Sequence, residues 1–130
     1  MSDPRTVTVS TLDHGPVTLP EPFWCVGFHP PGGYKADIAH YGQEIALTAE
    51  TSCHGEVRVL AASLYQGPFS EHETRNVAVA VEFGDFDTTD AHSLDAGELA
   101  GLADAMVAFA VGPLHQLIER LQLLEGGDAP

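Results

Sequence analysis

Apolar and polar side chains alternate along most of the first 84 residues, which is the pattern of strands with one buried face. Thr6–Leu12 and Val17–Leu19 flank the turn residues Asp13–Pro16, so the chain is predicted to open with a β-hairpin. In Val57–Tyr65 the inward-facing set changes near Leu60, as a β-bulge would cause. After the hairpin, the predicted strands are Tyr34–His40, Ile45–Ala49, Val57–Tyr65 and Val77–Phe83, and the last of these is predicted to be a buried final strand.

Residues 20–33 interrupt this alternation. Prolines and glycines are so frequent in this range that regular structure is not expected there. The same range also carries large apolar and metal-binding side chains: Phe23, Trp24, Cys25, Phe28 and His29. We therefore expect a loop that is irregular but ordered.

Helical spacing replaces the alternation after Asp95. Asp95 and Glu98 form a capping box, so a helical segment is predicted over residues 95–124. Gly112-Pro113 interrupts this segment and predicts either a kink or a second helix with Pro113 in its first turn. Apolar residues with an average spacing of about 3.5, typical of a coiled-coil seam, are Ala103, Val107, Ala110, Leu114, Leu117, Leu121 and Leu124.

This seam allows two arrangements. The helix covers the protein's own sheet, or it forms a homodimer through Leu114–Leu124. Together with the strands, it predicts an α+β fold, in which an antiparallel sheet of five or six strands carries the C-terminal helix on one face. A chain of 130 residues has the length of one domain, so residues 1–130 are predicted to form a single domain.

The charge balance narrows the possible partners. Five basic residues against nineteen acidic ones give a net charge of -14, which is the wrong sign for binding nucleic acid or an anionic membrane directly. Acidic residues without a compensating base concentrate over residues 82–98. This run leaves open an acidic inhibitor that mimics nucleic acid and binds a basic protein partner.

The chain carries no recognisable targeting segment. The first residues lack the apolar block of a signal peptide, and no window is expected to reach the roughly 20 apolar residues of a membrane span. We therefore expect a cytoplasmic protein. In that compartment Cys25 and Cys53 are expected to be reduced thiols or metal ligands and not a disulfide.

Cysteine and histidine side chains suggest a zinc site. Cys25 and His29 are four residues apart in the irregular loop, and thiolate and imidazole are the ligands that zinc prefers. His40 lies on the apolar face of the strand predicted next. Cys53 or His54, in a hairpin turn, is a candidate for the remaining ligand. A thiol-dependent enzyme with Cys25 as nucleophile and His29 or His40 as base is the alternative chemistry.

Several segments resemble a family of small uncharacterised actinobacterial proteins, a domain of unknown function common in Streptomyces. The resemblance lies in Thr6–Val17, Trp24-Cys25-x3-His29, Ala36–Gly42 and Leu99–Val107. It covers most of the chain, and the Trp-Cys-x3-His motif is its distinctive part. The family pattern has a further cysteine four residues before Cys25 and so implies a Cys/Cys/His/His metal site, whereas this sequence has Glu21 there. A carboxylate is also a zinc ligand, so the resemblance adds Glu21 to the candidates.

These observations predict a non-enzymatic cytoplasmic binding or interaction module. It dimerises through its C-terminal helix and carries a small structural zinc site in the loop. The acidic inhibitor and the thiol-dependent enzyme remain the alternatives, and no motif identifies a ligand or a reaction.

Overall fold

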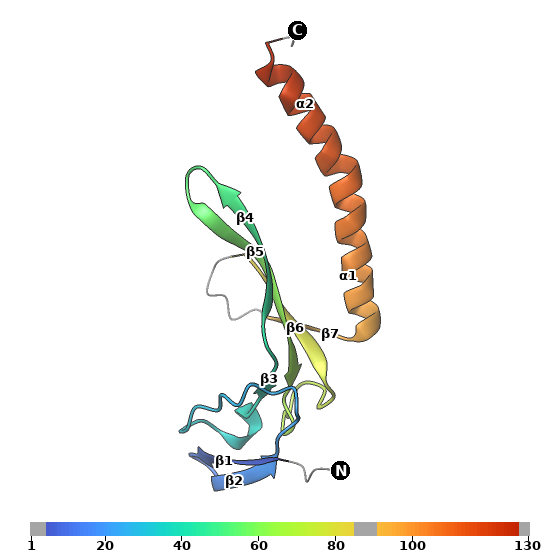
Figure 1. The fold of residues 1–130 in the computed structure, drawn as a ribbon. Coiled ribbons are helices and arrows are strands. Elements are labelled where there is room, and N and C mark those ends of the chain that lie inside the picture. The colour runs from blue at the N-terminus through green and yellow to red at the C-terminus, as the bar shows by residue number, and fades with distance from the viewer. Residues whose placement is uncertain (1–4, 85–90, 128–130) are drawn as a thin grey trace. The chain divides into compact units, whose positions relative to one another are not determined.

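The computed structural model describes residues 5–84 and 91–127 of the chain. Within it the chain forms two compact units, Met1–Asp95 and Ala96–Pro130, which we call the N-terminal unit and the C-terminal unit and describe separately. The N-terminal unit contains a two-stranded sheet and a five-stranded sheet, and the C-terminal unit is helical (Figure 1). The α+β class is therefore confirmed. The prediction of a single domain stays a prediction.

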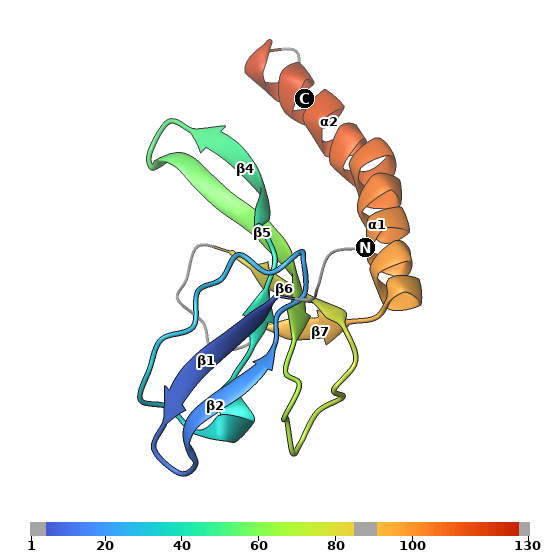
Figure 2. The same cartoon turned by 60° about the horizontal axis from the view of Figure 1, so that its bottom comes forward.

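The opening hairpin is confirmed. β1 (Thr6–Thr11) pairs antiparallel with β2 (Gly15–Pro20) and forms a sheet of its own (Figure 2). Val9 and Leu19 lie on its inner face and pack against Ile38 from the following loop, and these three residues form the buried apolar cluster of this region. Phe69, from the loop after the long central strand, packs against the same cluster. The hairpin is thus held by the segment before β3, through Ile38, and by the loop after β5, through Phe69.

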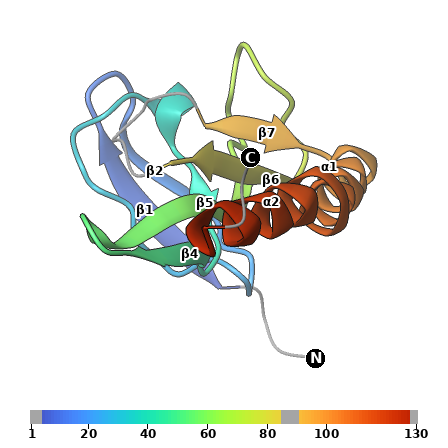
Figure 3. The ribbon, with the colours of Figure 1, turned by 90° about the horizontal axis from the view of Figure 1, so that it is seen from above.

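The five-stranded sheet is antiparallel. Its strands are β3 (His40–Tyr41), β4 (Ile45–Thr51), β5 (Gly55–Gln66), β6 (Ala78–Phe83) and β7 (His92–Leu94). β3 and β4 both pair with β5 along one side, and β6 and then β7 follow on the other side. Figure 3 shows the order β4, β5, β6 and β7. The register shifts between Leu47 and Thr48, opposite Leu60 and Arg58, so the bulge predicted near Leu60 is confirmed.

Two predictions about strands are wrong. Tyr34–His40 is not a strand: Lys35–Asp37 forms a 3-10 turn, and only His40–Tyr41 pairs with β5. The Asp13 carboxylate accepts a hydrogen bond from the Lys35 backbone N–H at 2.9 Å, which holds this segment in a turn beside the first hairpin. The strand at Val77–Phe83 is confirmed as β6, but it is not the final strand, because β7 pairs with its outer edge.

The hairpins β1–β2 and β4–β5 use the same turn. In each, a threonine (Thr11 or Thr51) accepts a hydrogen bond from the backbone N–H of the histidine three residues later. The same threonine donates to the carbonyl of the glycine that starts the next strand. That glycine has a positive φ, 60° at Gly15 and 63° at Gly55. Glycine adopts this conformation without the steric cost that a Cβ would add.

The C-terminal unit is one continuous helical run. α1 (Ala96–Phe109) starts directly after Asp95, as the capping box predicts, and α2 (His115–Glu125) completes the run. Ala110–Leu114, with Pro113 inside it, forms a π-helical turn between them, so the interruption predicted at Gly112-Pro113 is present as a local change of helix type, and the kink stays a prediction. A π turn closes its hydrogen bonds over five residues, which accommodates a proline that cannot donate one.

The π turn also changes which residues share a face. It holds about one residue more than an α-turn, so it rotates the following residues by as much as about 100°. Such a rotation turns Ala103, Val107 and Ala110 away from the α2 seam with which they were predicted to be continuous. The larger residues one position earlier take their place. The resulting apolar stripe contains Leu102, Met106, Phe109, Leu114, Leu117, Leu121 and Leu124.

The helix Ala96–Glu125 is also long and apolar enough to cross a membrane. It has 30 residues, and an 18-residue window within it has a mean hydropathy of 1.3. The expectation that no window approaches a span is therefore wrong by length and composition. A core helix of a soluble protein passes the same test, so this is weak evidence for a membrane location. Packing of the helix on the sheet stays a prediction. Half of the acidic residues in the run 82–98, Asp85, Asp87 and Asp90, lie outside the described residues.

Candidate metal centre

Four of the six predicted ligands converge in the N-terminal unit. Glu21, Cys25, His29 and His40 each offer one ligand atom, and these atoms all lie within 4.8 Å of one another. The first three come from the irregular loop that follows β2, and His40 begins β3. In the structure the loop and β3 thus bring these four candidate ligands together.

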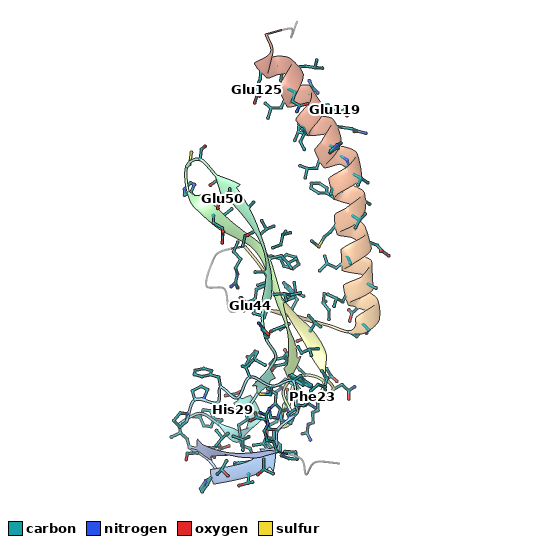
Figure 4. All side chains as sticks on the ribbon, in the orientation of Figure 1. Phe23, His29, Glu44, Glu50, Glu119 and Glu125 are labelled. Atoms are coloured by element: carbon teal, nitrogen blue, oxygen red, sulfur yellow. The ribbon has the colours of Figure 1, made fainter. Side chains whose placement is uncertain are left out.

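Backbone hydrogen bonds fix the loop at both sides of the cluster. The Glu21 N–H donates to the Arg5 carbonyl at 2.7 Å, beside the first hairpin. The Val26 N–H donates to the Tyr41 carbonyl at 2.8 Å, beside β3. The loop therefore spans the two sheets, and its ligands lie at their junction. Figure 4 shows His29 in this part of the molecule.

Arg5 is a positioning residue that the sequence did not reveal. Its guanidinium Nη2 donates to the carbonyls of Pro22, at 3.0 Å, and Cys25, at 3.2 Å. It thereby ties the loop segment between two candidate ligands back to the hairpin. The only available signal was that Arg5 is one of five basic residues in an acidic chain.

Two distances within the cluster match those between the ligands of a four-coordinate ion. Zinc bonds of about 2.0–2.3 Å place tetrahedral ligand atoms roughly 3.3–3.7 Å apart. Cys25 Sγ lies 3.7 Å from His29 Nε2, and His40 Nδ1 lies 3.5 Å from Glu21 Oε1. His29 Nε2 contacts Glu21 Oε1 directly as a hydrogen bond.

His40 gives an independent sign that a ligand is expected. The residue is 2% exposed, and its Nδ1 is a buried atom without a hydrogen-bond partner among the described residues. A buried polar atom that lacks a partner costs roughly 1–3 kcal/mol. Coordination of an ion by Nδ1 would remove that cost. The rings of Trp24 and His29 pack edge-on against His40, at 6.3 Å and 5.3 Å between ring centroids, and fix its orientation.

The ionisation of these groups follows from their burial. Burial raises the pKa of the Cys25 thiol, and a hydrogen bond to the Glu21 carboxylate raises it further. Burial lowers the pKa of His40, and the nearby His29 adds to this effect. For Glu21, burial opposes ionisation, but hydrogen bonds from Cys25 and His29 outweigh it, so its pKa is lowered. Without an ion, the cluster holds one carboxylate, a thiol and a neutral His40.

The remaining two candidates lie elsewhere. Cys53 and His54 occupy the β4–β5 turn, and Cys53 is exposed. His54 is placed by its N–H bond to Thr51 Oγ1 at 3.1 Å, as His14 is placed in the first hairpin. Glu50, labelled near this turn in Figure 4, lies far from His29. The structure thus places Cys53 and His54 apart from the cluster, and the fourth residue that lies beside Cys25, His29 and His40 is Glu21.

The chain matches the model of a known family. A family model described as a domain of unknown function (DUF6907) matches residues 6–122. The predicted resemblance to a domain of unknown function is thereby confirmed, whereas the actinobacterial origin and the Trp-Cys-x3-His motif stay predictions. No curated protein and no solved structure matches the chain.

Proposed function

The chain belongs to the DUF6907 family, and we propose that its N-terminal unit is a non-enzymatic binding module built around one zinc ion. The observation that carries the proposal is the convergence of four donor residues, among them His40, whose buried Nδ1 has no hydrogen-bond partner among the described residues and lies 3.5 Å from Glu21 Oε1. The same proposal includes a cytoplasmic location and dimerisation through the C-terminal helix.

The donor set suits zinc. Two nitrogens, one sulfur and one carboxylate oxygen are all common zinc ligands, while calcium and magnesium prefer oxygen alone. A Cys25 thiolate and a Glu21 carboxylate together carry two negative charges, which balance those of a divalent ion. The buried site would thus be neutral overall, which limits the cost of placing charge away from water.

Four protein ligands favour a structural ion. Catalytic zinc sites usually keep one position open for water or substrate, whereas four-ligand sites are closed. When bound, the ion would crosslink the loop to β3. Glu21, Cys25 and His29 would hold it from the loop, and His40 from the sheet. The raised pKa of the Cys25 thiol also argues against the thiol-dependent enzyme, because an activated nucleophile needs a lowered pKa.

The residues between the ligands support a binding role. Phe23, between Glu21 and Cys25, is 94% exposed, and Phe28, beside His29, is 72% exposed. Large aromatic side chains on a fixed loop are typical anchors of protein interfaces. The ion would hold these two aromatic side chains in place for a protein partner, and their display depends on the loop that the ligands fix.

Metal content tests the proposal. Protein purified without chelator should carry one zinc ion per chain by native mass spectrometry, and Cys25→Ser should reduce zinc occupancy strongly at the same free zinc concentration. Cys53→Ser is the matched control and should keep full occupancy, because Cys53 lies in the distant hairpin turn. A wild-type protein that takes up no zinc after reduction and zinc addition would overturn the proposal. Equal loss in both variants would also contradict it.

A further inference from the structure

The apolar stripe of the C-terminal helix has the features of a coiled-coil seam. Leu114, at the end of the π turn, and Leu117, Leu121 and Leu124 in α2 are separated by three, four and three residues, which corresponds to alternating a and d positions of a heptad. The π turn joins Leu102, Met106 and Phe109 to the same stripe. Each of the four leucines is at least 40% exposed in the structure.

The polar residues of α2 occupy the positions that a paired helix leaves in water. With Leu114 and Leu121 at a, the outer positions b, c and f hold His115, Gln116, Glu119 and Gln122. Leu123 is the one apolar exception on the outer face of α2. The assignment also places Arg120 at g and Glu125 at e. These flanking positions carry the charges that determine how two coiled-coil helices pair.

From this placement we infer that two copies of the chain pair in parallel through this stripe, with Arg120 of each copy facing Glu125 of the other. The inference rests on the helix-mediated dimer in the proposed function and adds its direction and register. In a parallel pair a g residue lies beside the e residue five positions later on the partner helix, and Glu125 is five positions after Arg120. The helix therefore complements a second copy of itself.

The same charges disfavour the opposite direction. An antiparallel pair places g beside g and e beside e. In the antiparallel register that packs the leucines of the two helices together, Arg120 would therefore face the Arg120 of the other copy. Like charges at such positions are repulsive. Between Ala96 and Glu125 the helix has only Arg120 and His115 as potential cations. No other arginine or lysine is therefore present to form an ion pair that would offset the repulsion between the two Arg120 side chains.

Charge reversal tests the pairing in the full-length protein. Glu125→Arg should weaken dimerisation roughly 5- to 30-fold by analytical ultracentrifugation, because it turns two attractive contacts per dimer into repulsive ones. The double variant Arg120→Glu/Glu125→Arg should restore wild-type affinity. Glu119→Arg, the same change at outer position f, is the matched control and should leave affinity unchanged.

Cysteine crosslinking tests the direction. In a Cys53→Ser background, Leu124→Cys should form a disulfide-linked dimer under mild oxidation, because d residues of a parallel pair adjoin each other. Glu119→Cys should not. A dimer that fails to crosslink at position 124, or a charge-reversed double variant that stays weak, overturns the parallel register but leaves the dimer.

A wild-type protein that is monomeric at micromolar concentration overturns both the dimer and the register. Binding of the protein to phosphatidylcholine vesicles, with no dimer in solution, also overturns both. Zinc content, measured on the same samples, reports separately on the metal site.

Discussion

Removal of zinc should destabilise the N-terminal unit by an amount that depends on free zinc in a defined way. An ion that binds only the folded state stabilises it by about 2.7 kcal/mol when free zinc is 100 times its Kd, and by about 1.4 kcal/mol more for each further tenfold. A domain of about 60–100 residues shifts its melting temperature by roughly 4–8 °C per kcal/mol. Stripping zinc should therefore lower the melting temperature by roughly 10–20 °C at the first of these concentrations.

The structure also determines where the loss should appear. The ligands span the segment from Glu21 to His40, and the ion would close a loop of that length. Disulfides that close loops of about 15 residues contribute roughly 3 kcal/mol in the chain-entropy account, which is similar to the value above. Hydrogen exchange should therefore increase in residues 21–42 after zinc removal, while exchange in Ala96–Glu125 should stay unchanged.

Thermal melts followed by circular dichroism in zinc-buffered solutions give the test. Plotted against the logarithm of free zinc, the melting temperature should rise once the concentration exceeds the Kd. Cys25→Ser should remove this dependence, and Cys53→Ser should keep it. A melting temperature that is independent of free zinc, or that responds equally in the two variants, would refute the reasoning.

Three further predictions concern the folded chain. Leu19→Ala should lower the free energy of unfolding in urea by about 2–5 kcal/mol, because Leu19 is 3% exposed in the apolar cluster. Leu12→Ala, at a 70% exposed position, should lower it by less than about 0.5 kcal/mol, and equal losses would contradict the assigned core. Gly55→Ala should cost about 1–2 kcal/mol because its φ is 63°, and Gly101→Ala, inside α1 with open space around it, should stabilise the helix by about 0.5–1 kcal/mol; the opposite signs in thermal melts would refute the turn. In zinc-free protein, burial holds the pKa of His40 below its usual value of about 6.5, so on acidification the unfolded state binds the proton before the folded state does. The free energy of unfolding should therefore fall as pH decreases from 7 toward 5, and the urea midpoint should fall less in His40→Asn than in the wild type. A midpoint that rises on acidification would contradict this account.

Elements with strong local signals were predicted well from the sequence. The hairpin at Thr6–Pro20 has alternation on both sides of a turn, and the start of α1 follows from the cap at Asp95. Tyr34–His40 also alternates, yet it forms a turn and a two-residue strand, because its conformation depends on distant partners. Asp13 holds one end, and β5 pairs with the other. Alternation by itself does not contain that information.

The candidate site was predicted in part for the same reason. Cys25 and His29 are close in sequence, so their spacing sufficed, and His40 followed from its place after the loop. Glu21 entered only through a resemblance. Cys53 and His54 have suitable chemistry, but the threonine–glycine turn that they share with Thr11–Gly15 places them at a hairpin tip. Pro113 predicted an interruption of the helix, because proline cannot donate a backbone hydrogen bond. The sequence does not show whether the chain responds by ending the helix or by forming a π turn, and the structure has the π turn.

The short connection between β7 and α1 has a consequence for affinity. Only Asp95 separates Leu94 from Ala96, so each helix begins almost where the sheet ends. In a parallel pair both helices begin at the same end, with axes about 8–10 Å apart. The two N-terminal units would then be tethered to the same end of the helix pair, which raises the effective concentration of one unit's loop beside the other's. A partner with two docking sites would gain avidity of about 10²–10⁴ over a single contact, without any new contact being made.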